Sequence, residues 1–292
     1  MMRRLAAPLL CSSFFLLMAC GSNNTNSKNP EQNTTAKTDQ SVAVKQTYQV
    51  EAVAHFNEPW AVTSLPDQRL LVTERQGKLK IFNPKNKQML DVQNVPAVNY
   101  GGQGGLGDVI LHPDFAKNHW VYLSYATKGQ GGSGAVISRA KLDLSNPNQP
   151  KLNDIKQIWQ QVPKVSGQGH YGHRMLFGTD GKLWVSSGER QKFDPAQNIK
   201  SNLGKILRLN EDGTAAEGNP FYKQGGVIAE IWSLGHRNPL GMAFDRQGQL
   251  WVVEMGPKGG DELNIITKGE NYGYPIVSNG DHYSGQPIPD HH

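Results

Sequence analysis

The chain has 292 residues and a formal net charge of +5 at neutral pH, and 19% of its residues are charged. Its 32 glycines and 17 prolines are typical of a turn-rich, all-β protein and disfavour a helical one. The basic residues form no dense stripe with interleaved aromatic residues, so nucleic-acid binding is unsupported.

The N-terminus has the layout of a signal peptide. Arg3 and Arg4 precede an apolar run over residues 5–18, which is too short to span a bilayer as a permanent helix. The run ends in Leu-Met-Ala-Cys20, which resembles the lipobox of bacterial lipoproteins. We predict a signal peptide over residues 1–19 and lipidation of Cys20; the alternative is an ordinary secretory signal that is cleaved nearby. Cys11 is lost with the signal, so the mature chain cannot form an internal disulfide.

Residues 20–45 are rich in Asn, Thr, Gln and Lys and poor in apolar side chains. Such a segment cannot bury enough surface to offset the entropy of ordering, which predicts a flexible tether. A tether after a lipidated cysteine predicts a domain anchored on the periplasmic side of a bacterial membrane, with the outer membrane as the expected site. The folded domain is expected over residues 46–292.

A strand–turn–strand pattern recurs in the folded part. Its four copies lie in residues 59–82, 106–125, 174–210 and 241–254. The turns contain Pro-Asp, Asp-Gly or Gln-Gly, which are typical of hairpins. Repeated antiparallel hairpins favour a β-propeller, and the constant position of the turn disfavours the alternative, a β-sandwich. The four copies predict about four blades, and no further strand pattern follows residue 270, so we expect a C-terminally truncated ring.

Two polar loops flank the fourth copy, at residues 235–241 and 254–264. Arg237 and Asn238 stand at one strand entrance, and Gly256 and Pro257 stand at the next strand exit. Binding and catalytic groups concentrate in such loops because a rigid sheet holds them in place. These loops are therefore the first candidates for a functional site.

Together with other segments, these loops resemble the soluble aldose sugar dehydrogenases of the glucose/sorbosone dehydrogenase family. The resemblance extends from about Pro59 to Pro289 and rests on motifs in the same order at residues 58–60, 102–106, 112–115, 169–172, 235–239, 256–262 and 271–275. Members of that family are six-bladed propellers that use pyrroloquinoline quinone (PQQ) and Ca²⁺. The resemblance implies that this chain binds both, with the cofactor across one face of the propeller.

His170 is the expected general base. It lies in a Gly-rich loop just before a strand, and an imidazole accepts protons near neutral pH. His173 competes for the role, and spacing alone does not separate the two; the resemblance assigns the role to His170. Some family members carry Asp or Asn where this chain has Gly169, so the resemblance does not extend to the residue before the base.

The resemblance also implies which residues bind the cofactor and the metal. Arg237 and Asn238 match a cofactor-contacting pair, and the fixed cation of Arg237 would stabilise charge on the reduced quinone. The alternative role for Arg237 is to lock a turn against Glu254 or Asp261. Gln103, in its own Gly-rich loop, resembles another cofactor-binding position.

The backbone carbonyl oxygens of Gly256 and Pro257 are the expected Ca²⁺ ligands, since calcium prefers oxygen. Asp261 and Glu262 lie close by in sequence, and we expect them to stabilise the loop rather than to bind the metal. Neither carboxylate is therefore counted as a metal ligand.

The resemblance predicts oxidation of the anomeric hydroxyl of an aldose to its lactone. The hydride would pass to PQQ with Ca²⁺ assistance, and the electrons would leave to an external acceptor. Two alternatives stay open. The chain is a lipid-anchored propeller that binds or scaffolds without catalysis, since fold does not fix function, or it is an inactive fragment that lacks the last blades.

Overall fold

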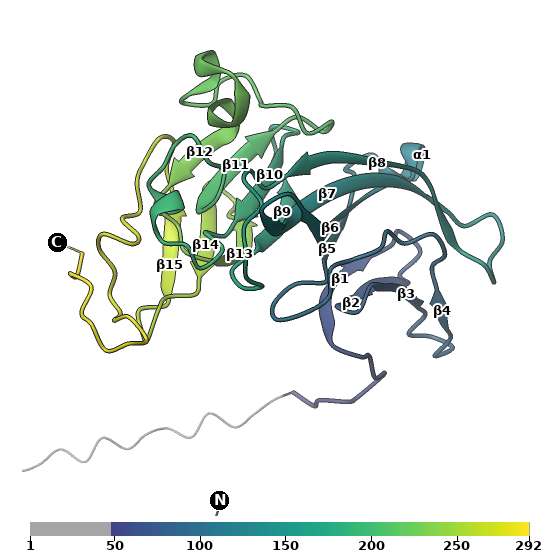
Figure 1. Ribbon diagram of the computed structural model, residues 1–292. Helices are drawn as coiled ribbons and strands as arrows, with labels where there is room; N and C mark the ends of the chain where they lie inside the picture. Colours follow the sequence, from purple (N-terminus) through teal and green to yellow (C-terminus); the bar gives the residue numbers. More distant parts are fainter. Residues whose placement is uncertain (1–47, 292) are drawn as a thin grey trace, which may run out of the picture. The chain divides into compact units, whose positions relative to one another are not determined.

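The structure is a computed structural model that describes residues 48–291. The predicted signal peptide, the lipidation site Cys20 and the whole of the predicted tether lie outside the described residues. One compact unit begins at Glu51 and contains every strand of the described residues. It consists of four antiparallel sheets that follow one another along the chain (Figure 1).

The first two sheets have four strands each, in chain order. The first contains β1 (Pro59–Ser64), β2 (Leu70–Glu74), β3 (Lys78–Phe82) and β4 (Met89–Asp91). The second contains β5 (Leu106–Leu111), β6 (Trp120–Gly129), β7 (Gly132–Asp143) and β8 (Lys151–Gln160). A short helix, α1 (Phe115–Asn118), connects β5 to β6.

The third and fourth sheets carry the longer loops. The third contains β9 (Gly172–Phe177), β10 (Leu183–Ser187), β11 (Lys205–Leu209) and β12 (Ile231–Leu234), with 3₁₀ turns η1 (Asp194–Ala196), η2 (Tyr222–Gln224) and η3 (Gly226–Glu230) in its connections. The fourth contains β13 (Pro239–Phe244), β14 (Leu250–Glu254) and β15 (Glu262–Ile266). Four consecutive antiparallel sheets confirm the predicted all-β propeller arrangement with about four blades.

The first hairpin of three sheets has the same turn, in which an aspartate side chain bonds the backbone. The carboxylates of Asp67, Asp180 and Asp245 each accept a hydrogen bond from the backbone N–H two residues later, at 2.9 to 3.0 Å. An aspartate that bonds its own backbone in this way favours a tight turn. The repeat seen in the sequence therefore corresponds to a repeated turn geometry.

Apolar residues between successive sheets form the core. Leu71 and Leu79 of the first sheet share a cluster with Leu123 of the second. Another cluster contains side chains of the second and third sheets, and another those of the third and fourth. Full burial of an apolar side chain contributes about 1.5 to 3 kcal/mol, so these clusters hold the sheets face to face.

A partly buried ion pair joins the second and third sheets. Asp108 of β5 accepts hydrogen bonds from the Arg174 guanidinium (3.1 Å) and from the backbone N–H of Met175 (2.8 Å). Arg174 also lies over the Trp60 ring, with 4.2 Å from its Cζ to the ring centroid. Burial raises the pKa of Asp108, although the Arg174 charge opposes the shift. This network fixes the start of β9, immediately after the loop that carries His170.

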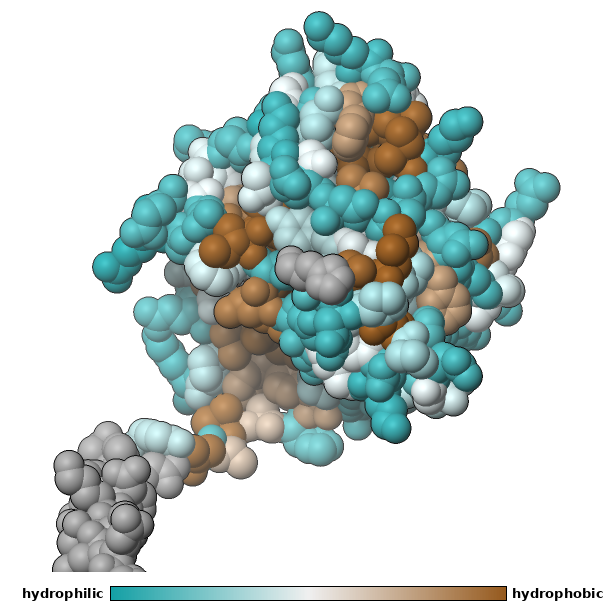
Figure 2. Space-filling view, turned by 90° about the vertical axis from the view of Figure 1, so that its left-hand side faces the viewer, coloured by the Kyte–Doolittle hydropathy of each residue, from teal (hydrophilic) through white to brown (hydrophobic). Residues whose placement is uncertain are grey.

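The outer face of the fourth sheet is apolar and open. Val253 is paired with Leu263 in the register of β14 and β15, and both side chains are more than half exposed. Figure 2, which looks at the side of the molecule where β15 lies, shows apolar patches between hydrophilic side chains. None of the helices in residues 48–291 is long and apolar enough to cross a bilayer.

Candidate active site

A buried carboxylate holds His170. The residue lies in the loop before β9, has a positive φ of 49° and is 3% exposed. Its Nδ1 lies 2.5 Å from Oε1 of Glu189, in the loop after β10. The second oxygen of Glu189 accepts from the backbone N–H of Lys192 and, at 2.7 Å, from that of Phe193. Glu189 is therefore fixed on both oxygens.

This contact determines what the imidazole can do. A carboxylate that accepts from Nδ1–H sets the tautomer in which Nε2 carries the free lone pair. His170 lines a cavity of about 220 Å³ together with Glu189, Arg237 and Pro257. The ring is therefore arranged to accept a proton from a group in that cavity.

Glu189 was not predicted from the sequence, although a signal was present. An acid recurs where the second strand of three repeats ends: Glu74 is the last residue of β2, Glu254 is the last residue of β14, and Glu189 lies two residues after β10. Glu254 holds His236 in the same way, with 2.9 Å between its Oε2 and Nδ1 of the histidine. A recurring acid at a strand exit is thus a recognisable feature of these blades.

Arg190 holds the loop that precedes β9 and carries His170. Its fully buried guanidinium donates to the carbonyl oxygens of Gly167 (2.9 Å) and Gly169, and to Oγ of Ser133 (3.0 Å). It also stacks on Tyr171, with 3.6 Å from Cζ to the ring centroid. A buried guanidinium is costly unless its donors are bonded. Nη1 and Nη2 of Arg190 are bonded in this way, whereas its Nε has no partner among the described residues. The bonds of Nη1 and Nη2 restrict the loop that ends at His170.

Arg237 is anchored to the loop that follows β14. Its guanidinium donates to the carbonyl oxygens of Met255 (2.9 Å) and Gly256 (2.6 Å), and its backbone N–H donates to Glu254. Within the described part of the chain, its buried Nε has no hydrogen-bond partner. The side chain therefore does not lock a turn against a carboxylate, and it keeps a donor that can bind an acidic group.

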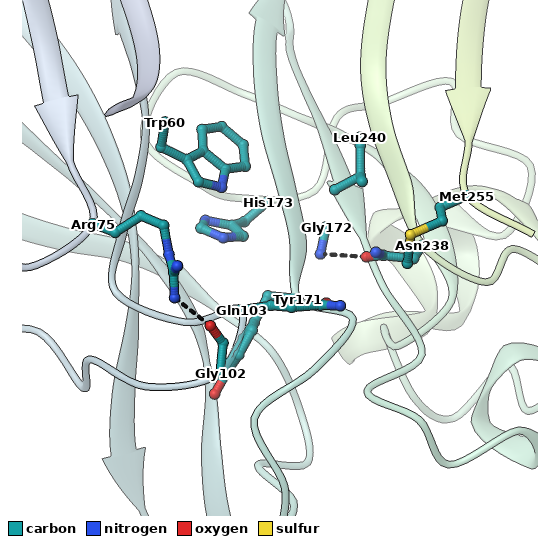
Figure 3. A pocket seen from close by; sticks show the side chains of 10 residues that line it. All are labelled: Trp60, Arg75, Gly102, Gln103, Tyr171, Gly172, His173, Asn238, Leu240 and Met255. Atoms are coloured by element: carbon teal, nitrogen blue, oxygen red, sulfur yellow. Dashed lines mark hydrogen bonds between the residues drawn. The ribbon is translucent and has the colours of Figure 1, made fainter. Parts of the chain in front are cut away.

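Two predicted cofactor-binding amides brace the backbone around His170. Oε1 of Gln103 accepts from the backbone N–H of His170 at 2.6 Å, and Oδ1 of Asn238 accepts from that of Gly172 at 3.1 Å. Both line a second hollow of about 290 Å³, where Asn238 points to Gly172 (Figure 3). The structure thus brings His170, Arg237 and Pro257 to one cavity, and Gln103 and Asn238 to its neighbour.

The loop of Gly256 and Pro257 is stabilised by a carboxylate. Asp261 Oδ1 accepts from the backbone N–H of Gly256 at 2.9 Å, and Glu262 lies 3.3 Å from Nε2 of His291. The Asp261 contact agrees with the expectation that this acid holds the loop, whereas the Glu262 contact is made to the C-terminal segment. Over residues 48–291, no cluster of three or more His, Cys, Asp or Glu side chains could hold a metal ion.

The competing histidine, His173, has a different environment. It lines the second hollow, packs on Trp60 with 5.0 Å between ring centroids, and contacts Oγ of Ser124 at 2.9 Å through Nδ1. Burial lowers its pKa to about 3, and the charges of Arg174 and Arg190 add to the shift. A base that weak accepts protons poorly at neutral pH, so the geometry favours His170 for proton transfer.

Comparison with known sequences identifies one family. The profile of the glucose/sorbosone dehydrogenase family matches residues 56–292. The aldose sugar dehydrogenase YliI of Escherichia coli (strain K12) is 40% identical over 240 residues, which is 80% of this chain and 63% of that protein. Quinoprotein glucose dehydrogenase B of Acinetobacter calcoaceticus is 32% identical, over 77% of this chain and 52% of the relative. The chain thus spans less than two thirds of the length of these relatives.

Solved structures show the same fold. The PQQ-bound aldose sugar dehydrogenase of Streptomyces coelicolor superposes with a TM-score of 0.71 at 34% identity, over 82% of this chain and 69% of that one. The soluble aldose sugar dehydrogenase of Escherichia coli, in its apo form, superposes with a TM-score of 0.74 at 40% identity, over 80% of this chain and 67% of that one. These similarities confirm the family resemblance derived from the motifs.

The environment of His173 predicts a pH-dependent stability. Its folded pKa of about 3 lies below the ordinary value of 6.5, so the unfolded chain binds the extra proton as the pH falls from 6.5 towards 3. The stabilisation is complete above pH 6.5 and is lost progressively below it. In His173→Gln, the fall in melting temperature between pH 7 and pH 4 should be smaller than in the wild type. An equal fall in both proteins would show that His173 is not the group responsible.

Proposed function

Because this chain belongs to the glucose/sorbosone dehydrogenase family, we propose that it oxidises the anomeric hydroxyl of aldose sugars to lactones, with PQQ and Ca²⁺ as cofactors and an external electron acceptor. The observation that carries the proposal is the His170–Glu189 pair, which faces the same cavity as Arg237 and Pro257. The named relatives are sugar dehydrogenases, and one of the solved structures contains PQQ. A proton acceptor beside a fixed cation is the arrangement that such an oxidation needs.

The residues around the cavity fit both groups. The unpartnered Nε of Arg237 offers a buried charged donor to the carboxylate or quinone oxygens of PQQ. The carbonyl oxygens of Gly256 and Pro257 are hard ligands of the kind that calcium takes. Gly256 O already accepts from Arg237, but a carbonyl oxygen has a second lone pair for a cation.

The chain's own residues handle the proton and the charge. When bound, PQQ supplies the two-electron acceptor and Ca²⁺ supplies a Lewis acid that polarises it. Nε2 of His170 accepts the proton of the anomeric hydroxyl while the C–H bond of the same carbon breaks and the carbonyl of the lactone forms. Glu189 holds the ring in place and stabilises the imidazolium. Arg237 adds a cation on the side where negative charge develops.

A direct test follows dye reduction by aldoses after PQQ and Ca²⁺ are added to the purified chain. The wild type should reduce the dye, and His170→Ala should lower kcat about 100- to 10,000-fold, since general-base catalysis contributes that much. His55→Ala serves as the control, because His55 is exposed and lies outside the cavity. PQQ binding by His170→Ala, followed by absorbance, should be unchanged. A wild type that binds PQQ and oxidises no aldose would favour the non-catalytic alternative.

A second test addresses the carboxylate. Glu189→Gln keeps the shape of the side chain but replaces the acceptor oxygen pair with an amide that also donates, so the His170 tautomer is no longer fixed. We expect kcat to fall by at least about tenfold with KM little changed. Unchanged kcat would mean that the pair is structural only. The melting temperature of the variant separates loss of fold from loss of turnover.

We also propose that Cys20 anchors the domain to the periplasmic side of a bacterial membrane through a lipid. The support is the lipobox-like segment before Cys20 and the polar segment that follows. The wild-type chain should sediment with membranes and incorporate labelled palmitate, whereas Cys20→Ser should do neither. A wild type that is released in soluble form, without label, would contradict the anchor.

A further inference from the structure

Three consecutive residues after β10 contact different parts of the loop before β9, residues 161–171, which carries His170. Glu189 holds the imidazole ring, Arg190 holds the carbonyl oxygens of Gly167 and Gly169, and Gln191 is the third. Arg190 and Gln191 have positive φ values of 65° and 58°. Non-glycine residues rarely adopt this conformation, and where they do it often marks a functional constraint.

The Gln191 side chain lies against Gly169, the residue directly before His170. A Cβ placed on Gly169 would lie 2.4 Å from both Cδ and Oε1 of Gln191, closer than any real contact allows. Gly169 does not have a positive φ, so its backbone does not require glycine. The absence of a side chain at position 169 therefore leaves room for the Gln191 carboxamide.

This carboxamide faces the proposed reaction centre. Gln191 is exposed and lines the same cavity as His170, Glu189 and Arg237. Its amide hydrogen-bonds no other residue in the described part of the chain, whereas the amides of Gln103 and Asn238 are bonded to backbone. A free carboxamide offers two donors and an acceptor to a ligand.

We propose that Gln191 is a specificity-determining residue that binds the hydroxyl on the carbon next to the one being oxidised, the 2-hydroxyl of the aldose. This inference rests on the proposed function, because the amide lies beside the residue that precedes the proposed base. A 2-hydroxyl both donates and accepts, and a carboxamide can match both. Sugars that lack this hydroxyl leave the amide without that partner, so the site discriminates against them.

Because the Gln191 carboxamide contacts Gly169, a substitution at position 169 can displace it without any change to Gln191 itself. The atoms that a methyl group at position 169 would meet are the far end of a flexible, exposed side chain. Gly169→Ala should therefore push the carboxamide out of the cavity and leave the backbone in place. It should have the same effect as Gln191→Ala without changing residue 191.

The experiment compares glucose with 2-deoxyglucose in the chain loaded with PQQ and Ca²⁺. Gln191→Ala should lower kcat/KM for glucose about fivefold, the value of one net hydrogen bond, mainly through KM, and leave 2-deoxyglucose unchanged. Gly169→Ala should act in the same way, and the double variant should lose no more than either single variant. Gln247→Ala, an exposed glutamine in the β13–β14 hairpin, serves as the matched control and should behave as the wild type.

The outcomes separate the inference from the proposed function. A wild type that oxidises no aldose contradicts the proposed function and this inference together. An active wild type whose preference for glucose over 2-deoxyglucose survives in Gln191→Ala contradicts the inference alone. A general folding defect lowers activity on both sugars equally and leaves their ratio unchanged, so it cannot imitate the expected result.

Discussion

Burial of one carboxylate, Glu189, is the constraint on which the arrangement of the site depends. A charged group removed from water costs several kcal/mol unless its oxygens are bonded. Here Nδ1 of His170 meets one oxygen, and the backbone N–H groups of Lys192 and Phe193 meet the other. These bonds require the chain to turn sharply, with positive φ values at Arg190, Gln191 and Phe193. The strained turn and the oriented imidazole are therefore two consequences of the same buried charge.

The propeller explains why the site residues converge. In each antiparallel sheet, the first strand starts and the second strand finishes at the same end of the sheet. His170 precedes β9 and Glu189 follows β10; Arg237 precedes β13 and Pro257 follows β14. The backbone N–H of Glu189 donates to the carbonyl oxygen of Arg237 at 2.8 Å. This bond joins the loop after β10 directly to the loop before β13. Stacked sheets thus supply a rigid frame, and the loops supply the chemistry.

The repeats could be predicted because each hairpin carries the same turn signal and the same apolar strands. The strands β4, β7, β8, β12 and β15 were not predicted. β4 and β12 are short and β8 is rich in polar residues, as in its sequence Lys-Leu-Asn-Asp. β7 and β15 lie outside the repeated strand–turn–strand copies. Of the predicted site residues, His170, Arg237 and Pro257 share a cavity, while Gln103 and Asn238 bond to backbone. Glu189 was not predicted, although the acid that recurs at the exit of the second strand was a local signal for it. Arg190 and Gln191 were not predicted, because their roles arise from contacts with a loop about 20 residues away, which no local pattern encodes.

The central claim is that the cavity beside His170 holds the cofactor. A crystal structure of the chain with PQQ and Ca²⁺ tests it most directly. We predict PQQ density in the cavity lined by His170 and Arg237, with Ca²⁺ on the carbonyl oxygens of Gly256 and Pro257 and His170 still in contact with Glu189. Cofactor density elsewhere on the propeller, or His170 turned away from it with its contact to Glu189 broken, would contradict the account.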